Sequence, residues 1–249
     1  MNRVREIYED LGAPGAQKLW LEIKKRGIQV SRQQVVDFVG RQGERQVYTA
    51  PLPKAKGQTV SEDLNARYML DVVFVRDLIV VFLVNVFSRK TWGRVVANKS
   101  AKAVLAAGKQ LIERLPEQPK VVSTDDGGEY TELAEWLKSK NIGHKVHVSD
   151  KDVNALAVLD RAVQDVKQRF TRILARSGPG DEKLKLERAL KAHNNAHHGT
   201  VHGSPNEVSK DSNLKFMNLV DNAQRIEHNI KVLDGRKGNL KKLVLLGSP

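Results

Sequence analysis

Three apolar runs follow one another closely in the first half of the chain, and they constrain the fold more than any other feature. They span residues 68–75, 78–87 and 91–97. Each has the length and the β-branched content of a strand, and the short link Arg76-Asp77 suits a tight hairpin. Helical and strand-like patterns then alternate along the chain. This order predicts an α/β layered domain with antiparallel first strands and parallel later strands.

Caps and breakers set the limits of the elements that follow. Ser100 is a good N-cap for a helix that ends before Pro116. The glycines of segment 177–180 end a long helix that begins near residue 153. The other expected elements are strands over 120–124 and 143–148 and helices over 131–140 and 181–196.

The N-terminal part of the chain has apolar residues at helical spacing. Helices are expected over residues 3–11 and 16–25, and Ser31 is a good N-cap for a third helix. The third helix and its end carry the polar residues Arg32, Gln33, Gln34 and Arg41. These residues suit a small helix-turn-helix-like domain that faces DNA. A plain helical hairpin packed on the core accounts for the same pattern, so both interpretations stay open.

Two basic segments flank the layered domain. Residues 43–66 are polar and contain prolines, which is typical of a linker. Residues 210–249 form a basic extension, in which we expect a helix over 213–221 and short strands or an extended tail over 225–233 and 240–246. The predicted domain organisation is therefore a helical domain (1–42), a linker (43–66), an α/β core (67–209) and a C-terminal extension (210–249).

Charge is distributed unevenly along the chain. The net charge is +13, with 11 basic and 6 acidic side chains in residues 1–60. Residues 61–160 have 14 of each, and residues 161–249 have 17 basic and 9 acidic side chains. Basic flanks around a neutral middle indicate a nucleic-acid partner, with a merely soluble basic surface as the alternative. The flanking residues expected to contact nucleic acid are Arg32, Arg41, Lys54, Lys56, Lys241 and Lys242.

Composition excludes several other classes of protein. The chain has no cysteine, so disulfides and thiolate zinc sites are excluded. The longest apolar run, residues 78–84, is too short to span a bilayer, so no membrane partner is expected. The N-terminus contains acidic residues and no apolar segment, which is unlike a secretory signal or a transit peptide.

Three aspartates stand where an acidic residue needs an explanation. Asp71 interrupts a strand that is apolar on both faces, where an unpaired carboxylate is unfavourable. Asp125 ends a second apolar strand, and Asp160 lies beside the apolar stripe of the long helix. Carboxylates that converge in this way can hold two divalent cations, Mg²⁺ or Mn²⁺, for cutting and joining phosphodiesters. Taken alone, the three residues are better explained as paired or exposed structural acids, but the surrounding motifs favour the metal site.

Those motifs, in their order, resemble the catalytic core of DDE integrases of the retroviral type, particularly those of Maverick/Polinton transposons. They are 68–71 (YMLD), 84–90 (VNVFSRK), 123–130 (STDDGGEY), 158–161 (VLDR), 193–201 (HNNAHHGTV) and 204–208 (SPNEV). The segment 15–41 also resembles the helical segment that precedes Polinton-type cores. The resemblance extends over roughly residues 10–210.

The resemblance implies a fold and a chemistry. The family fold is RNase H-like, a mixed five-stranded sheet with helices on both faces, here preceded by the small helical domain. The family chemistry is Mg²⁺-dependent end processing and strand transfer of DNA. By position, Asp71, Asp125 and Asp160 would be the catalytic metal ligands, and Arg161 and Lys167 would contact nucleic acid. An active integrase would act in the nucleus, as a homo-oligomer or within a larger complex.

Departures from the family pattern support a second hypothesis. The third acid is Asp160 where the family usually has Glu, and Asn85 and His193 replace an expected acid and an expected aromatic residue. The chain also has no Cys-containing zinc module and no complete C-terminal barrel. The alternative is a domesticated, catalytically silent integrase fold. It would bind RNA or DNA inside a larger assembly such as a ribonucleoprotein, and would localise with that assembly.

Histidines near the end of the core permit one more interpretation. They are His193, His197, His198 and His202, and the first two are one helical turn apart, as zinc ligands often are. The resemblance explains the same segment as the end of the integrase core, which is the interpretation we favour. The three tryptophans are expected to pack in the core, because they do not alternate with basic residues as base-stacking residues do.

Overall fold

The computed structural model describes residues 1–42, 59–147, 156–178 and 180–246, with the side chains of the last range as far as residue 230. Its centre is a five-stranded sheet with the strand order β3-β2-β1-β4-β5. The strands are β1 (Arg67–Val75), β2 (Leu78–Asn85), β3 (Thr91–Val96), β4 (Val121–Asp125) and β5 (Gly143–His147).

The sheet is mixed, as the sequence predicts. Strands β1, β2 and β3 pair antiparallel, whereas β4 pairs parallel with both β1 and β5. The hairpin between β1 and β2 turns at Arg76, whose φ of 53° lies in the left-handed region that such tight turns use. The predicted order of antiparallel strands followed by parallel strands is therefore confirmed.

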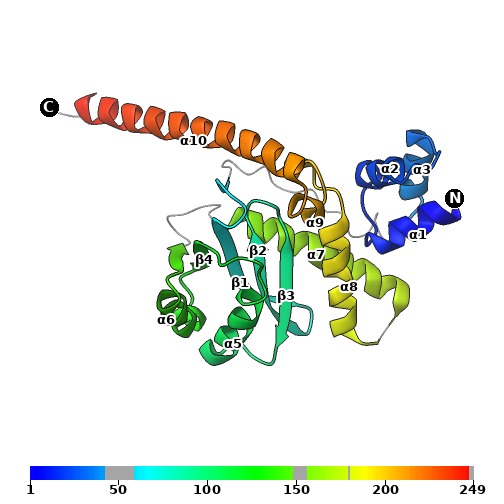
Figure 1. The fold of residues 1–249 in the computed structure, drawn as a ribbon, viewed down its shortest axis with the longest axis horizontal. Helices are drawn as coiled ribbons and strands as arrows, with labels where there is room; N and C mark the ends of the chain where they lie inside the picture. The colour runs from blue at the N-terminus through cyan, green and yellow to red at the C-terminus, as the bar shows by residue number, and fades with distance from the viewer. Residues whose placement is uncertain (43–58, 148–155, 179, 247–249) are drawn as a thin grey trace.

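Helices cover both faces of the sheet (Figure 1). One face carries α5 (Ala101–Ile112) and α6 (Thr131–Ser139), and the other carries α7 (Ala157–Ser177) and α8 (Glu182–Asn195). Side chains alternate along a strand. Leu70 and Val72 therefore pack under α5 and α6, whereas Met69 packs under α7. By the same alternation Asp71 belongs to the α7 face. Residues 148–155, which include the predicted start of α7, lie outside the described residues.

The N-terminal helices α1 (Asn2–Asp10), α2 (Ala16–Lys25) and α3 (Arg32–Gly40) form a small core of their own. Ser31 caps α3 as predicted, because its side chain accepts a hydrogen bond from the Gln34 backbone while the Gln34 side chain accepts one from the Ser31 backbone. Trp20 packs at the edge of this core, and Trp92 and Trp136 pack against the core under α5. The tryptophans are thus packing residues, as the sequence suggests.

Arginines of α7 hold the N-terminal helices against the sheet domain. Arg169, which is 1% exposed, donates to the carbonyl of Leu11, and Arg172 Nη1 donates to the carbonyl of Ala13 at 3.0 Å. Between these carbonyls, Gly12 has a φ of +63°, and a Cβ there would lie 3.1 Å from the Cβ of Arg169. Both the backbone conformation and the close approach therefore require glycine at this turn.

The C-terminal extension differs from the prediction. After η2 (Gly199–Val201) and α9 (Pro205–Val208), one long helix, α10 (Ser212–Leu246), projects from the body of the molecule (Figure 1). The short strands or extended tail predicted over 225–233 and 240–246 are therefore wrong. Gly235 and Gly238 lower the helix propensity of this stretch, which hid the helix from sequence analysis. Among the described residues, no helix has the length and apolar content needed to cross a membrane.

Candidate functional site

Asp71 and Asp125 lie on neighbouring parallel strands. Strand β1 pairs with β4 through Met69 and Ser123, and each aspartate follows its paired residue by two positions. Both aspartates are half-buried. Burial raises the pKa of Asp125, and the nearby charge of Asp71 raises it further. The strand order thus brings two carboxylates that are distant in sequence into electrostatic contact.

Asp160 lies in the first turn of α7. The residue as a whole is solvent-exposed, but partial burial of its carboxyl group and the charge of Asp71 raise its pKa. Helix α7 covers the face of the sheet to which Asp71 belongs, which accounts for this contact. Asp71 is therefore the common neighbour of the other two carboxylates.

The three carboxylates are not gathered around a single point. Among the residues that the structure describes, no three acidic, histidine or cysteine side chains stand close enough together to hold one metal ion. The donor set nevertheless suits a hard divalent cation, because all three groups offer carboxylate oxygens. The raised pKa values of Asp125 and Asp160 also reflect like charges that a cation would neutralise. The donor chemistry therefore suits a hard cation, although the described residues do not form a three-ligand site.

Tyr130 fixes the orientation of Asp71. It ends η1 (Gly128–Tyr130), the short turn after β4. Its hydroxyl donates to Asp71 Oδ1 at 2.9 Å and accepts from the backbone N–H of Val72 at 3.2 Å. Burial and the charges of Asp71 and Asp125 raise the pKa of Tyr130, so the phenol stays protonated and remains a donor. Sequence analysis placed Tyr130 only inside a motif and did not assign it this contact.

Arg161 and Lys167 lie on different sides of α7. Lys167 is half-buried about two turns beyond Asp160. Burial lowers the pKa of Lys167 and the charge of Asp71 partly restores it, so the ammonium group faces the carboxylates. Arg161 is exposed and lines a separate pocket. The two cations predicted to act together on nucleic acid therefore face different surroundings.

Of the remaining residues predicted to contact nucleic acid, the structure describes the side chains of Arg32 and Arg41. Arg32 Nη2 donates to Gln17 Oε1 at 3.0 Å, and its guanidinium stands 6.0 Å from the centre of the Trp20 ring. Arg41 is exposed at the end of α3. Lys54 and Lys56 lie outside the described residues, and Lys241 and Lys242 belong to a part of α10 whose side chains are not described. Their contact with nucleic acid stays a prediction.

Two of the four histidines near the end of the core contact carboxylates. His193 Nδ1 lies 2.8 Å from Asp165 Oδ2, and His202 Nε2 lies 2.7 Å from Asp221 Oδ2. Although burial opposes its charge, Arg169 and His193 hold the pKa of Asp165 well below its usual value. Sequence analysis missed the Asp165–His193 pair. Its only local signal is the spacing of Asp165 and Arg169, one helical turn apart on α7.

Asn85, which stands where the family often has an acid, has a structural role. Its Nδ2 donates to the carbonyl of Leu64 at 2.5 Å, and its Oδ1 accepts from the backbone N–H of Ser88 at 2.8 Å. An ionised aspartate at this position could not donate to Leu64. The amide therefore shapes the turn between β2 and β3.

Comparisons with known proteins agree with the observed fold. Residues 63–151 match the family model of the integrase core domain. The catalytic core domain of BIV integrase shares 19% sequence identity and a TM-score of 0.51, over 61% of this chain and 99% of its own. The HTLV-2 integrase catalytic core, solved with magnesium in a trimeric form, shares 17% identity and a TM-score of 0.51, over 59% and 97%. A sequence comparison with curated proteins gave no significant match.

Structural likeness at this level of identity shows the fold, and it confirms the predicted RNase H-like sheet with flanking helices. The sequence match includes Asp71 and Asp125 and ends before Asp160. Residues 63–151 are therefore similar to the integrase core domain, and the chain has the fold of retroviral integrase catalytic cores.

Proposed function

We propose that this chain is a metal-dependent polynucleotidyl transferase that acts on DNA, with Asp71, Asp125 and Asp160 as its metal ligands. The observation that carries the proposal is the position of Asp71, whose charge acts on both of the other carboxylates. The three groups come from β1, β4 and α7. Like charges brought together in a fold oppose its stability, and a bound cation relieves that repulsion. Nucleic acid and further copies of this chain are the partners that such an activity implies.

In this proposal, Asp71 and Asp125 would hold one divalent cation, and Asp71 and Asp160 would hold a second, either Mg²⁺ or Mn²⁺. Divalent cations bound there would stabilise the charge on the attacking and leaving oxygens of a phosphodiester. Tyr130 donates to Oδ1 of Asp71, so Oδ2 would be the oxygen left for a ligand. Lys167, on the side that faces Asp71, would bind a phosphate of the substrate.

A strand-transfer assay with Mg²⁺ or Mn²⁺ tests the proposal, together with the metal-induced rise in the thermal midpoint. We expect Asp71→Asn to abolish both the activity and the rise, because Asp71 belongs to both proposed cation sites. The matched control is Asp77→Asn, an exposed aspartate in the hairpin between β1 and β2, which should behave like the wild type. Equal metal responses of the wild type and Asp71→Asn would overturn the assignment.

One observation favours a second candidate function, a catalytically silent integrase fold that binds RNA or DNA within a larger assembly. Asp160 is solvent-exposed and carries a side chain one methylene shorter than the Glu that is usual in the family. Metal sites tolerate misplacement of a ligand poorly, on the order of 0.5 Å. If the carboxylate of Asp160 cannot reach the metal, the chain would keep its fold and its basic surface but lose strand-transfer activity.

The variant Asp160→Glu separates the two functions. If the short side chain limits an active site, Glu should raise metal affinity and strand-transfer rate by about tenfold, the effect of roughly 1.4 kcal/mol. Inactivity of both the wild type and Asp160→Glu, with nucleic-acid binding intact, would contradict the enzyme and support the silent subunit.

A further inference from the structure

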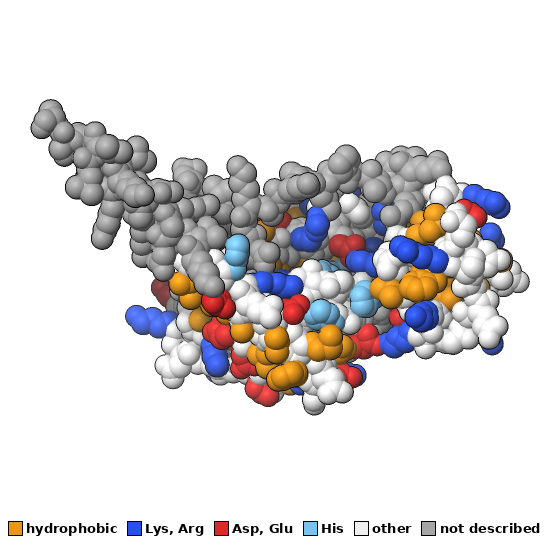
Figure 2. Space-filling model, turned by 90° about the horizontal axis from the view of Figure 1, so that it is seen from above, with side chains coloured by type: hydrophobic (Ala, Val, Ile, Leu, Met, Phe, Trp, Pro, Cys, Tyr) orange, Lys and Arg blue, Asp and Glu red, His pale blue; other side chains and the backbone are white. Residues whose placement is uncertain are grey.

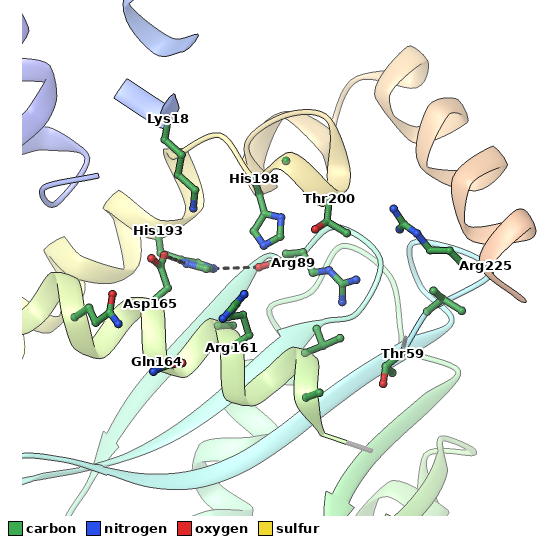
Figure 3. A pocket seen from close by; sticks show the side chains of 16 residues that line it. Lys18, Thr59, Arg89, Arg161, Gln164, Asp165, His193, His198, Thr200 and Arg225 are labelled. Atoms are coloured by element: carbon green, nitrogen blue, oxygen red, sulfur yellow. Dashed lines mark hydrogen bonds and ion pairs between the residues drawn. The ribbon is translucent and has the colours of Figure 1, made fainter. Parts of the chain in front are cut away.

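A basic cavity of about 700 Å³ lies where the core, the N-terminal helices and α10 meet. Figure 3 shows Lys18 reaching it from α2, Arg161 from α7 and Arg225 from α10, with Arg89 between them. Asp165 is the one acidic residue among its described lining residues. Its carboxylate is already engaged by Arg169 and His193, both at 2.8 Å. The cavity therefore has an excess of positive charge.

Arg89 is the central feature of this cavity. The residue is 9% exposed, and its Nη1 is buried with no hydrogen-bond partner. Its backbone, in contrast, is firmly held: the N–H donates to Asn85 at 2.9 Å, and the carbonyl accepts from Thr91 Oγ1 at 3.1 Å. The φ of Arg89 is +64°, a strained value for a residue other than glycine. An anchored, strained turn thus presents a guanidinium group that nothing in the described chain pairs.

The charges around Arg89 require a counterion. Burial and the charge of Arg225 lower the pKa of Arg89 to about 10, so the guanidinium stays charged at neutral pH. Burial, helped by the charges of Lys18 and Arg89, lowers the pKa of His198 to about 3, so this neighbour stays neutral. A buried charge without a partner is strongly unfavourable. An anion beside Arg89 would pair its guanidinium, whereas Arg225 already pairs with Asp221 at 3.5 Å and would only add positive charge.

We propose that this cavity binds a backbone phosphate of the nucleic acid. A planar guanidinium group can donate two parallel hydrogen bonds to a phosphate, and Lys18, Arg161 and Arg225 add charge on the other sides. The hydroxyl of Thr200, which faces Arg89 in Figure 3, offers a further donor. Figure 2 shows the wider face, where histidine side chains lie among lysine and arginine side chains.

The position of the cavity relates it to the carboxylates. Ala157, Val158 and Arg161 of the first turns of α7 line it, and Asp160 stands on the same turn. Adjacent helical residues point to different sides of the helix. A phosphate in the cavity would therefore lie about one helix diameter, roughly 10 Å, from the carboxylates. The inference deepens the proposed function: it rests on nucleic-acid binding but not on the metal.

Binding of a labelled DNA duplex, measured by fluorescence anisotropy in EDTA over a range of salt concentrations, tests the inference. We expect Arg89→Met to weaken binding about tenfold and to make the slope of log K against log salt shallower by about one. The matched control is Arg114→Met, an exposed arginine after α5, which should bind like the wild type. Without DNA, Arg89→Met should unfold at the wild-type temperature or higher, because an unpaired buried charge is removed.

Several outcomes would overturn the inference. Equal losses for Arg89→Met and Arg114→Met would indicate unspecific attraction to a basic surface. Stabilisation by inorganic phosphate that depends on Arg89, with DNA binding unchanged, would assign the cavity to free phosphate instead. If Arg89→Met does not fold, Arg225→Met supplies the same comparison from α10. Asp71→Asn should keep Arg89-dependent binding, so failure of the metal site and failure of the cavity are distinguishable.

Discussion

A single hydroxyl group, that of Tyr130, offers a test of the candidate metal centre. It donates to Asp71 and accepts from the backbone N–H of Val72. Tyr130→Phe should lower the free energy of unfolding by about 0.5–1.5 kcal/mol, because the hydrogen bond to Asp71 is lost while the Val72 N–H keeps Asp71 Oδ1, at 2.6 Å, as an acceptor. It should also weaken Mg²⁺ or Mn²⁺ binding, because Asp71 loses its orientation. Urea unfolding without metal and calorimetric titration with metal give the two values.

A second tyrosine provides the control. Tyr68 is also buried in the sheet, and its hydroxyl bonds Asn85 rather than a carboxylate. Tyr68→Phe should lower stability and leave metal affinity unchanged. If Tyr130→Phe behaves in the same way, Tyr130 supports the fold alone and does not position Asp71.

His198 should make stability depend on pH. Burial lowers its pKa to about 3 from an ordinary 6.5. Below pH 6.5 the unfolded chain gains a proton that the folded chain does not, so stability falls as pH falls, by about 1.4 kcal/mol per pH unit. His198→Gln should remove this part of the slope in urea unfolding between pH 6 and 4.5. The exposed His228→Gln is the control, and an unchanged slope in His198→Gln would contradict the prediction.

These residues also show which parts of the candidate site can be predicted from sequence. Asp71 and Asp125 could be located because each belongs to a short apolar strand with a recognisable motif. The contact of Tyr130 with Asp71 and the burial of Arg89 could not, because both depend on how distant segments pack. From sequence alone, an arginine in a turn is expected to be exposed to solvent. Arg89 is buried because helices from distant parts of the chain pack around it.

At the scale of elements, the attachment of α10 to the core depends on two buried amides. Asn218 Nδ2 donates to the carbonyl of Val201 at 3.0 Å, and Asn222 Nδ2 donates to the carbonyl of Ser61 at 2.9 Å. Truncating either to alanine leaves a carbonyl without this donor, and should lower the free energy of unfolding by about 1–3 kcal/mol. Denaturant unfolding measures the change.

Gln224→Ala is the matched control, because Gln224 is an exposed amide on the same helix. It should change stability by less than about 0.5 kcal/mol. Losses that are equally small for Asn218→Ala and Asn222→Ala would show that apolar contacts, rather than these amides, attach the helix.

The elements themselves were predictable where local signals agree. Ser100 caps α5 as expected, accepting from the Ala103 backbone at 3.3 Å, and the strand runs correspond closely to β1, β2 and β3. The first part of α10 agrees with the helix predicted over 213–221, but its continuation to Leu246 was missed because Gly235 and Gly238 weaken the helical pattern there.

For the whole molecule, the central question is whether the N-terminal helices and the integrase core unfold as one unit. Arg169 joins them: it pairs with Asp165 at 2.8 Å and donates to Leu11 across the junction. The two parts also meet through Arg172, which donates to Ala13 at 3.0 Å. Lys18 of α2 lines the cavity around Arg89. The contacts between the N-terminal helices and α7 therefore also maintain the proposed phosphate site.

We expect the wild type to unfold in a single transition, because buried polar contacts couple the two parts. Fluorescence of Trp20 reports on the N-terminal helices once Trp92 and Trp136 are changed to Phe, and circular dichroism reports on the whole fold. Arg169→Met should lower stability by about 1–3 kcal/mol, because the Leu11 carbonyl loses its donor and Asp165 keeps only His193 as a partner. It should also shift the Trp20 transition to lower denaturant than the rest. Arg114→Met, which changes an exposed arginine after α5, should keep the transitions coincident. Separate transitions in the wild type would mean that the N-terminal helices fold on their own and only rest against the core.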